Sequence, residues 1–167
     1  FVLDYSVPIK KIDGWSEKGI NPDVEAISGN NAGMVLDFGE LEGSEVLFKI
    51  ALSYTTVDNA IENLNTELPH WDFEKIRKDT RDIWNEMFGR IAVEGGSQAQ
   101  HIKFYTDLWH ALLGRHKITD VNGYYPDYTA GPYVNKRTAA PMKIRRVPMD
   151  KTGKPTFNMY GFDGLWL

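Results

Sequence analysis

The sequence predicts an α+β fold in which strands come first and helices follow. Residues 1–54 contain short runs in which apolar and polar side chains alternate, as they do in half-buried strands. Residues 55–113 instead carry apolar side chains at the three- and four-residue spacing of amphipathic helices. A block of strands followed by a block of helices is typical of α+β folds. The length of 167 residues fits one average domain or parts of two.

Composition excludes several classes of protein. With 42% hydrophobic and 25% charged residues, the chain as a whole is not disordered. The net charge of −4 disfavours a dedicated nucleic-acid binder. The absence of cysteine excludes disulfides, thiolate zinc sites and cysteine nucleophiles. No apolar run approaches the roughly 18 residues of a membrane span, and the sequence starts without a secretory signal. We expect the chain to be cut at both ends.

Three segments are predicted as strands: 1–7, 34–38 and 46–52. In the first, alternation places Phe1, Leu3, Tyr5 and Val7 on one face. The asparagines and glycines of 29–33 suit positive φ angles and predict a tight turn or bulge, and a second turn is expected at 42–44. So few strands with one apolar face cannot close a sandwich, so we expect partner strands outside this chain.

Two helices should follow. Thr55 and Asp58 have nearly the spacing of a capping box, and the first helix is expected to reach about Leu64. Asp72 is the predicted N-cap of the second helix, and Gly89 its end. The apolar face of this second helix consists of Phe73, Ile76, Ile83, Trp84, Met87 and Phe88.

A third helix is predicted after a short β segment at 90–93 and a turn at 95–96. Ser97 and Gln100 have capping-box spacing, and Gly114 is the expected stop. The apolar stripe of this helix consists of Ile102, Tyr105, Leu108, Trp109, Leu112 and Leu113.

Residues 115–160 show no clear period and are predicted to form a long loop. Five prolines and five tyrosines lie in it, and so long a loop in a compact domain is usually functional or disordered. Its aromatic content argues against simple disorder. Between 131 and 156 the net charge is +6. This basic segment either binds phosphate or nucleic acid or, as we favour, is a solvated loop or an interdomain contact.

Most titratable side chains are interpreted as surface groups. His101 and His110 are nine residues apart on one helix, hence on opposite sides of it, and cannot share a metal on that helix alone. The carboxylate pairs Asp58/Glu62 and Asp79/Asp82 lie on polar helix faces rather than in a cleft.

Four tryptophans divide into two groups. Trp84 and Trp109 fit helical stripes and are expected in the core, whereas Trp15 and Trp71 adjoin turns, where they either stack on a sugar or pack half-buried.

The most unusual segment is 119–128, in which Asp and Tyr surround an Asn122-Gly123 turn. It either binds a hydroxyl-rich ligand or is a turn whose Asp caps its own backbone.

A series of stretches from Ser28 onward carries a family resemblance, with order and spacing that agree over about two thirds of the chain. They are SGNNAG (28–33), KIALSY (49–54), AIENLNTE (60–67), WNE (84–86), IAVEGG (91–96), FYTDLWHALL (104–113) and DVNGY (120–124). Together they resemble glycoside hydrolase family 92, the calcium-dependent exo-acting α-mannosidases.

The resemblance implies a domain layout. Residues 1–54 would be the C-terminal strands of an N-terminal β-sandwich, 55–92 a two-helix linker, and 93–167 the first helix and long loop of an (α/α)6 toroid that is the catalytic domain. This layout would account for the missing partner strands.

The resemblance also implies an activity, namely inverting hydrolysis of terminal α-mannosides, which we expect to be α-1,2-linked. In such enzymes a glutamate acid, an aspartate base and a sugar-binding calcium act together. These residues lie downstream in family members, so none is assigned in this chain, and the chain alone is expected to be inactive. Mannose-containing glycans are the implied partners, and the periplasm, cell surface or exterior the implied location.

One family subsite would fall within the chain. Phe162-Asp163 stands where family members have a Trp-Asp pair whose Asp faces the terminal sugar. Phe162 and Asp163 are therefore the substrate-binding candidates, with a surface or N-cap role for Asp163 as the alternative.

Two other functions stay open at this point. One is a stand-alone carbohydrate-binding module that uses exposed Trp and Tyr. The other is a structural interaction domain that oligomerises through its exposed sheet face.

Overall fold

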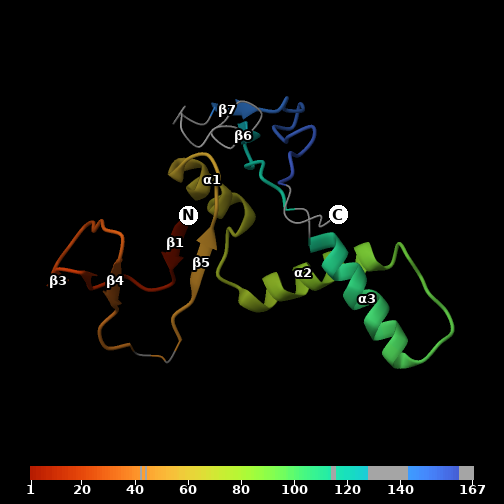
Figure 1. Ribbon diagram of the computed structural model, residues 1–167, viewed down its shortest axis with the longest axis horizontal. Coiled ribbons are helices and arrows are strands. Elements are labelled where there is room, and N and C mark those ends of the chain that lie inside the picture. Colours follow the sequence, from red (N-terminus) through yellow and green to blue (C-terminus); the bar gives the residue numbers. More distant parts are fainter. Residues whose placement is uncertain (42, 44, 114–115, 128–142, 162–167) are drawn as a thin grey trace. The chain divides into compact units, whose positions relative to one another are not determined.

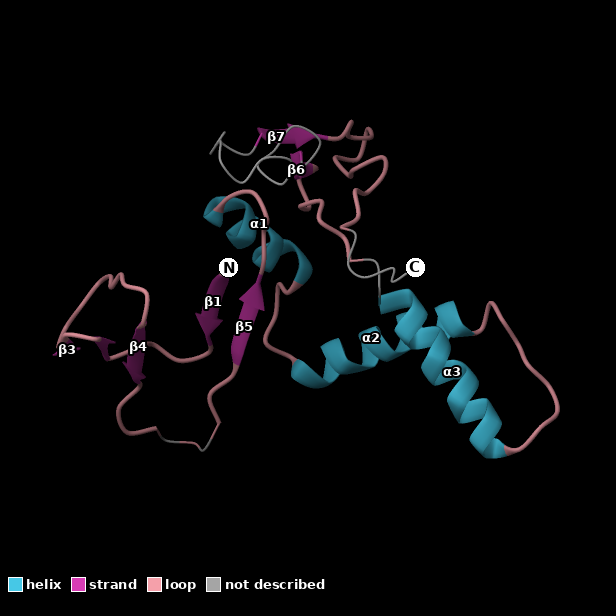
Figure 2. Cartoon of the chain, in the orientation of Figure 1, coloured by secondary structure: helices cyan, strands magenta, loops and turns pink. Residues whose placement is uncertain are grey.

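The computed structural model describes residues 1–41, 43, 45–113, 116–127 and 143–161 (Figure 1). Those residues form a mixed α/β structure with several small antiparallel sheets and three helices (Figure 2). Strands occur before and after the helices. The chain divides into two compact units, residues 2–50 and residues 51–167 with Phe1, and each is described by itself below.

The first unit contains a three-stranded antiparallel sheet in the order β3-β2-β4. Its strands are β2 (Lys11–Ser16), β3 (Gly19–Asn21) and β4 (Ala32–Asp37). β4 confirms the strand predicted at 34–38, whereas β2 and β3 were not predicted. Gly14 interrupts the alternation of apolar and polar residues in β2. The structure explains why a glycine stands there, because a Cβ would lie 2.8 Å from the Ile27 side chain.

A two-stranded sheet pairs β1 (Val2–Tyr5) with β5 (Phe48–Ala51), as predicted for the segments 1–7 and 46–52. The ring of Tyr5 packs at 5.3 Å from Phe38 and 6.4 Å from Phe48. Of the face expected to be apolar, Tyr5 and Val7 are half-buried, but Phe1 and Leu3 are exposed.

The expectation of positive φ at 29–33 was wrong. Positive φ angles occur instead at other glycines, among them Gly19 and Gly39, and at Asp23. Gly33 has a different role in β4. It pairs with Trp15, and an added Cβ would lie 2.7 Å from the indole ring. Glu42 and Ser44 of the predicted second turn lie outside the described residues.

Helix α1 (Val57–Glu67) begins one residue later than the predicted capping box. Its N-cap is Thr56, whose hydroxyl accepts a hydrogen bond from the Asn59 N–H at 3.1 Å. The prediction of a Thr55/Asp58 box was therefore wrong, because the Thr55 side chain turns toward a different partner, described below. The helix buries Ala60, Asn63 and Leu64.

Helices α2 (Phe73–Phe88) and α3 (Gln98–Leu113) confirm the predicted helices and their N-terminal signals. Asp72 caps α2 by accepting from the Lys75 N–H at 2.9 Å, and Gly89 ends it with a right-handed φ of −63°. Ahead of α3, the Ser97 N–H donates to Gln100 Oε1 at 2.7 Å, and the Gln100 N–H donates back to Ser97 Oγ at 3.4 Å.

Aromatic rings join α2 to α3. Trp84 and Trp109 meet at 6.5 Å edge to face, and Phe88 and Tyr105 at 6.1 Å. The two tryptophans thus contact each other as a core pair would, but Trp109 stays 38% exposed. The segment 90–93 was predicted as β and is instead irregular. The Ile91 carbonyl accepts from the Tyr105 hydroxyl at 3.1 Å rather than from a strand.

The region expected to be a loop contains a β-hairpin, which corrects that prediction. Strand β6 (Tyr124–Asp127) pairs antiparallel with β7 (Lys143–Arg146), with Tyr125 opposite Arg145. The sequence of β7 is mostly basic, so it shows no alternation that would reveal a strand. Gly114 and the basic residues Lys136 and Arg137 lie outside the described residues.

The buried apolar side chains of the second unit lie on α1 and around the hairpin. Among the described residues they are Ala60, Leu64, Ile118 and Val147, together with Pro126.

Candidate functional site

The carboxylate of Asp120 is the centre of a buried hydrogen-bond network. Asp120 is 4% exposed. Its Oδ2 accepts from Ser53 Oγ at 2.9 Å, Thr55 Oγ1 at 2.6 Å and Asn59 Nδ2 at 3.2 Å, and its Oδ1 accepts from Asn63 Nδ2 at 2.7 Å. We call these five residues the Asp120 network. Asn59 and Asn63 are four residues apart and so project from one face of α1.

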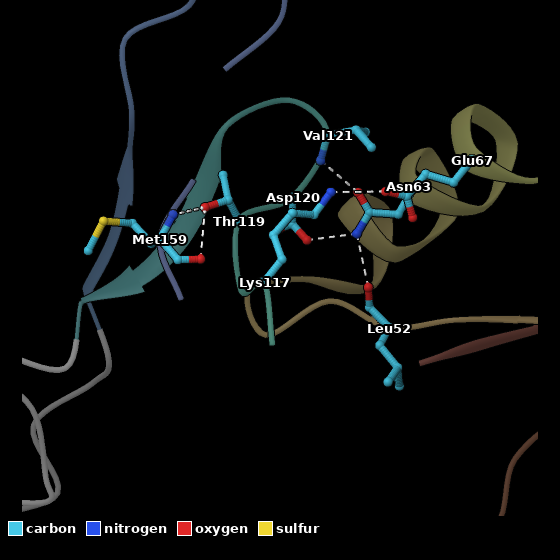
Figure 3. Close-up of polar contacts among 8 residues, drawn as sticks. All are labelled: Leu52, Asn63, Glu67, Lys117, Thr119, Asp120, Val121 and Met159. Atoms are coloured by element: carbon cyan, nitrogen blue, oxygen red, sulfur yellow. Dashed lines mark hydrogen bonds and ion pairs between the residues drawn. The ribbon is translucent and has the colours of Figure 1, made fainter. Parts of the chain in front are cut away.

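Asn63 also fixes two backbone segments (Figure 3). Its Nδ2 donates to the Leu52 carbonyl at 2.9 Å, and its Oδ1 accepts from the Val121 N–H at 2.9 Å. The amide is 7% exposed, so these partners satisfy a polar group that water scarcely reaches. α1 is thereby attached to the segments on both sides of the network.

The turn after Asp120 follows the prediction for Asn122-Gly123. The Gly123 N–H donates to the Asp120 carbonyl at 2.9 Å, and Gly123 has a φ of 87°. The Asn122 amide donates to Asn59 Oδ1 at 2.9 Å and Glu62 Oε2 at 2.6 Å. The hypothesis of ligand-binding carboxylates in 119–128 is wrong for Asp120, because donors within the protein occupy both of its oxygens.

Next to the Asp120 network, residues 116–119 hold the segment 159–161. The Ile118 N–H donates to the Met159 carbonyl at 2.9 Å, and the Gly161 N–H donates to the His116 carbonyl at 2.9 Å. Thr119 Oγ1 accepts from the Met159 N–H at 2.6 Å (Figure 3). Gly161 is the last described residue of this segment. The predicted substrate-binding residues Phe162 and Asp163 follow directly and lie outside the described residues.

A cavity of about 320 Å³ lies between the hairpin and this segment. In it, Asp127 is 5% exposed and accepts from Arg145 Nε at 2.5 Å. Aromatic rings beside a charged pair can contact both the apolar face and the hydroxyls of a small polar ligand. The lining residues are Ile118, Tyr125, Pro126, Asp127, Arg145, Met159 and Tyr160.

The carboxylate pairs behave as the surface groups that were predicted. Asp79 accepts from Lys75, and Asp82 from Lys78 at 2.7 Å, all on the exposed side of α2. The hydrogen bond from Lys75 holds the pKa of the Asp79 carboxyl below its usual range.

No three His, Asp or Glu side chains among the described residues lie close enough together to hold a metal. These residues therefore do not fit the implied calcium.

A second, more apolar depression of about 460 Å³ lies on α2 and α3. Phe88, His101, Ile102, Tyr105, Thr106 and Trp109 line it. Elsewhere Trp15 is 39% exposed, and Trp71 is half-buried. A sugar-binding alternative would depend on the exposed rings among these, namely Trp15 and Trp109.

Comparison with known proteins decides the family. Residues 59–166, well over half of the chain, match the profile described as the glycosyl hydrolase family 92 catalytic domain. The chain belongs to glycosyl hydrolase family 92. The family 92 match begins in α1 and includes α2, α3, the hairpin and the predicted pair at 162–163.

Two relatives agree with the family 92 assignment. A solved structure of a family GH92 inverting mannosidase from Bacteroides thetaiotaomicron VPI-5482 has a similar fold, with a TM-score of 0.71 and 20% identity over 88% of this chain. An uncharacterized secreted glycosidase from Arthroderma benhamiae is 28% identical over 83 residues, which is 47% of this chain. The chain spans only 19% of the first relative and 11% of the second.

Sequence reasoning missed the Asp120 network and the contact between Thr119 and Met159. A partial signal was present, because Asn59 and Asn63 have helical spacing and Asp120 lies in the segment that was singled out. Pairing them needs tertiary structure, since 57 residues separate Asn63 from Asp120.

The described helices include none that is long and apolar enough to cross a membrane.

Proposed function

We propose that this chain is part of a family 92 glycoside hydrolase that removes terminal α-mannose from glycans with inversion. The observation that carries the proposal is the family match over residues 59–166. The fold similarity to an inverting mannosidase of the same family supports the choice of sugar and of stereochemistry.

The proposal includes the domain layout implied by the resemblance. Residues 1–54 would end a β-sandwich, 55–92 would form a helical linker, and 93–167 would begin an (α/α)6 catalytic domain. The likeness to the mannosidase over 88% of the chain supports a layout that continues beyond these residues.

An inverting mechanism needs a carboxylic acid and a carboxylate base about 6.5–9.5 Å apart, with room between them for sugar and water. The buried carboxylates Asp120 and Asp127 accept hydrogen bonds from protein donors, and Asp79 and Asp82 form surface ion pairs. We therefore assign neither catalytic role to these four residues. The resemblance to the family implies an acid and a base that lie downstream of these residues, and we propose that placement.

The contribution of this chain would be to bind and orient the substrate. Asp163 and Phe162 are the proposed contacts to the terminal sugar, and the segment 159–161 leads directly into them. Calcium, when bound, would supply a positive charge for sugar hydroxyls, and we place its ligands outside this chain as well. The isolated 167-residue chain should then be inactive.

We further propose an α-1,2 linkage preference and a location in the periplasm, at the cell surface or outside the cell. The description of the Arthroderma relative as secreted supports export.

The test is hydrolysis of α-1,2-, α-1,3- and α-1,6-mannobiose by the full-length protein, followed by proton NMR. The proposal expects β-mannose as the first product, preference for the α-1,2 isomer and loss of activity with a calcium chelator. α-Mannose as the first product would contradict inversion, and no mannose release would contradict the activity. If the 167-residue chain bound mannobiose while the full-length protein stayed inactive, a carbohydrate-binding module would be the better assignment.

A further inference from the structure

We propose that the cavity between the β6–β7 hairpin and residues 159–160 binds one neutral hexopyranose unit of a glycan. The guanidinium of Arg145 would bind the sugar hydroxyls, and the rings of Tyr125 and Tyr160 would contact its apolar face. The inference rests on the proposed function only in taking mannose as the sugar, because the chemistry of the site is argued from the side chains that line it.

One face of the hairpin supplies the polar side of the cavity. Tyr125 lies directly opposite Arg145 in the strand register, so these two side chains stand on the same face of the pair. Asp127 is two residues further along β6 and belongs to that face as well. The register thus brings a tyrosine ring, a carboxylate and a guanidinium together, and all three line the cavity.

The guanidinium of Arg145 is fixed through only one of its nitrogens. Its Nε donates to Asp127 Oδ2 at 2.5 Å, and the Asp127 side chain is 5% exposed whereas that of Arg145 is 58% exposed. Within the described part of the chain, neither terminal nitrogen of Arg145 donates a hydrogen bond. Because arginine carries its donors in a rigid planar fork, the buried carboxylate orients the remaining N–H groups for a ligand.

The opposite wall of the cavity is also held in place. The Ile118 N–H donates to the Met159 carbonyl at 2.9 Å, and Thr119 Oγ1 accepts from the Met159 N–H at 2.6 Å. Tyr160 follows directly and is 54% exposed. An accessible aromatic ring therefore projects from a backbone that the protein fixes on its other side.

The size and charge of the cavity favour a small neutral ligand. Its volume of about 320 Å³ is at the low end of the range of about 300–1,000 Å³ that is usual for ligand pockets. The charges of Asp127 and Arg145 offset each other, so an anion attracted by the guanidinium would also meet the buried carboxylate. A hexopyranose suits this lining, because it offers hydroxyls to the donors and an apolar face of C–H groups to the rings.

The experiment measures how fast phenylglyoxal modifies Arg145 in the full-length protein as methyl α-mannoside is added, by mass spectrometry of the peptides. Arg77 on α2 is the internal control, because its side chain is 60% exposed and also forms an ion pair. Tyr160→Ala is compared with Phe157→Ala, which removes an aromatic ring that is 51% exposed and lies outside the lining of the cavity.

Mannoside at about ten times its Kd should slow the modification of Arg145 about tenfold and leave Arg77 unchanged. Tyr160→Ala should raise the Kd obtained from this protection about five- to tenfold, because one ring contact to the sugar is lost. Phe157→Ala should keep the Kd within about twofold of the wild type.

Unchanged modification of Arg145 at the highest soluble mannoside concentration would overturn the proposal. Equal protection by sodium acetate would identify an anion site instead, and equal effects of Tyr160→Ala and Phe157→Ala would reject the ring contact. Hydrolysis of mannobiose by a protein whose Arg145 stays unprotected would reject this inference alone. Protection of Arg145 in a protein that hydrolyses no mannoside would support sugar binding here while the proposed function failed.

Discussion

Asn63 joins helix α1 to two segments that are far from each other in the sequence. Its amide contacts the Leu52 carbonyl, the Asp120 carboxylate and the Val121 N–H, and it lies on the buried face of α1. A buried polar group that loses its partner costs more free energy than an intact hydrogen bond contributes. The replacement of Asn63 by an apolar residue should therefore affect all three contacts together.

We predict that Asn63→Leu, which keeps the side chain's approximate size, lowers the free energy of unfolding by about 2–4 kcal/mol. Urea unfolding followed by circular dichroism measures the loss. Asn65→Leu on the exposed side of the same helix is the control, with an expected change within about 0.5 kcal/mol. Similar losses in both variants would show that the network does not carry the effect.

Arg145 and Asp127 form an ion pair with unequal exposure. The Asp127 side chain is 5% exposed, whereas that of Arg145 is 58% exposed. We predict that Arg145→Met lowers the free energy of unfolding by about 1–2 kcal/mol, because a buried carboxylate loses its guanidinium. Lys143→Met, at an exposed position of the same strand, should change it by less than about 0.5 kcal/mol. Equal stability of Arg145→Met and the wild type would mean that other groups satisfy Asp127.

At the scale of single elements, α2 allows an N-cap to be compared with a surface ion pair. Asp72 caps the helix, whereas Asp79 pairs with Lys75 while both side chains are about half exposed. Asp72→Ala should lower the free energy of unfolding by about 1 kcal/mol. Asp79→Ala should lower it by at most about 0.5 kcal/mol, since water screens an exposed pair. Thermal or urea unfolding checks the order, which a larger loss for Asp79→Ala would contradict.

The turn at 150–154 should respond to pH in acid. The Lys154 N–H, the Thr152 hydroxyl and the Thr152 N–H bind the Asp150 carboxylate and hold its pKa below the usual 3.8. Because the folded pKa is lowered, the stabilisation is fully present above 3.8 and is lost as the pH falls through the lowered value.

Carbon-13 NMR titration of the Asp150 side chain measures this pKa. Thr152→Val removes one donor, so it should bring the pKa back toward 3.8 while the Lys154 N–H still holds it lower. A wild-type pKa at or above 3.8 would refute the assigned hydrogen bonds.

At the scale of the whole molecule, the described elements leave much apolar surface uncovered. Neither α2 nor α3 buries a residue, and Ile102 on α3 is 60% exposed. In the two-stranded sheet, Phe48 is 63% and Ile50 51% exposed. Apolar surface of this kind favours association with another protein surface.

We predict that the 167-residue chain self-associates through this sheet face, and that its sedimentation coefficient rises with concentration. Ile50→Lys should abolish the rise, whereas Ile102→Lys on α3 should not. Loss of association in Ile102→Lys alone would place the contact on the helices, and a coefficient independent of concentration would contradict self-association. The domain layout and the identity of the sugar contacts remain predictions at this scale.

Local signals predicted the helices well because they act within a few residues. Asp72 and the Ser97/Gln100 pair satisfy N–H groups of the helix that directly follows them. The first cap was placed one residue early, because Thr55 and Thr56 can both serve and only the position of Asp120 selects between them. The Asn122-Gly123 turn was also predicted from a local signal, because the two residue types by themselves favour a turn.

Strands whose signal depends on a partner were missed. β7 reads as a basic run, and its strand conformation is evident only from its pairing with β6. Gly14 interrupts the alternating pattern of β2. A larger residue does not fit at this position, because the side chains of Val24 and Ile27 lie where its Cβ would be. Neither reason can be found within the strand itself.

The sequence by itself predicted an α+β class, the three helices, the Asn122-Gly123 turn and the family, because short-range spacing or the order of short stretches carries each of these signals. The structure supports the mixture of helices and strands, but β6 and β7 come after the helices and not before them. Tertiary structure alone decided that Asp120 faces α1 rather than a ligand and that Thr119 holds Met159. Those contacts join residues 40 to 67 positions apart. A buried carboxylate or hydroxyl takes the donors that folding brings near it, and the sequence around it does not say which donors these will be.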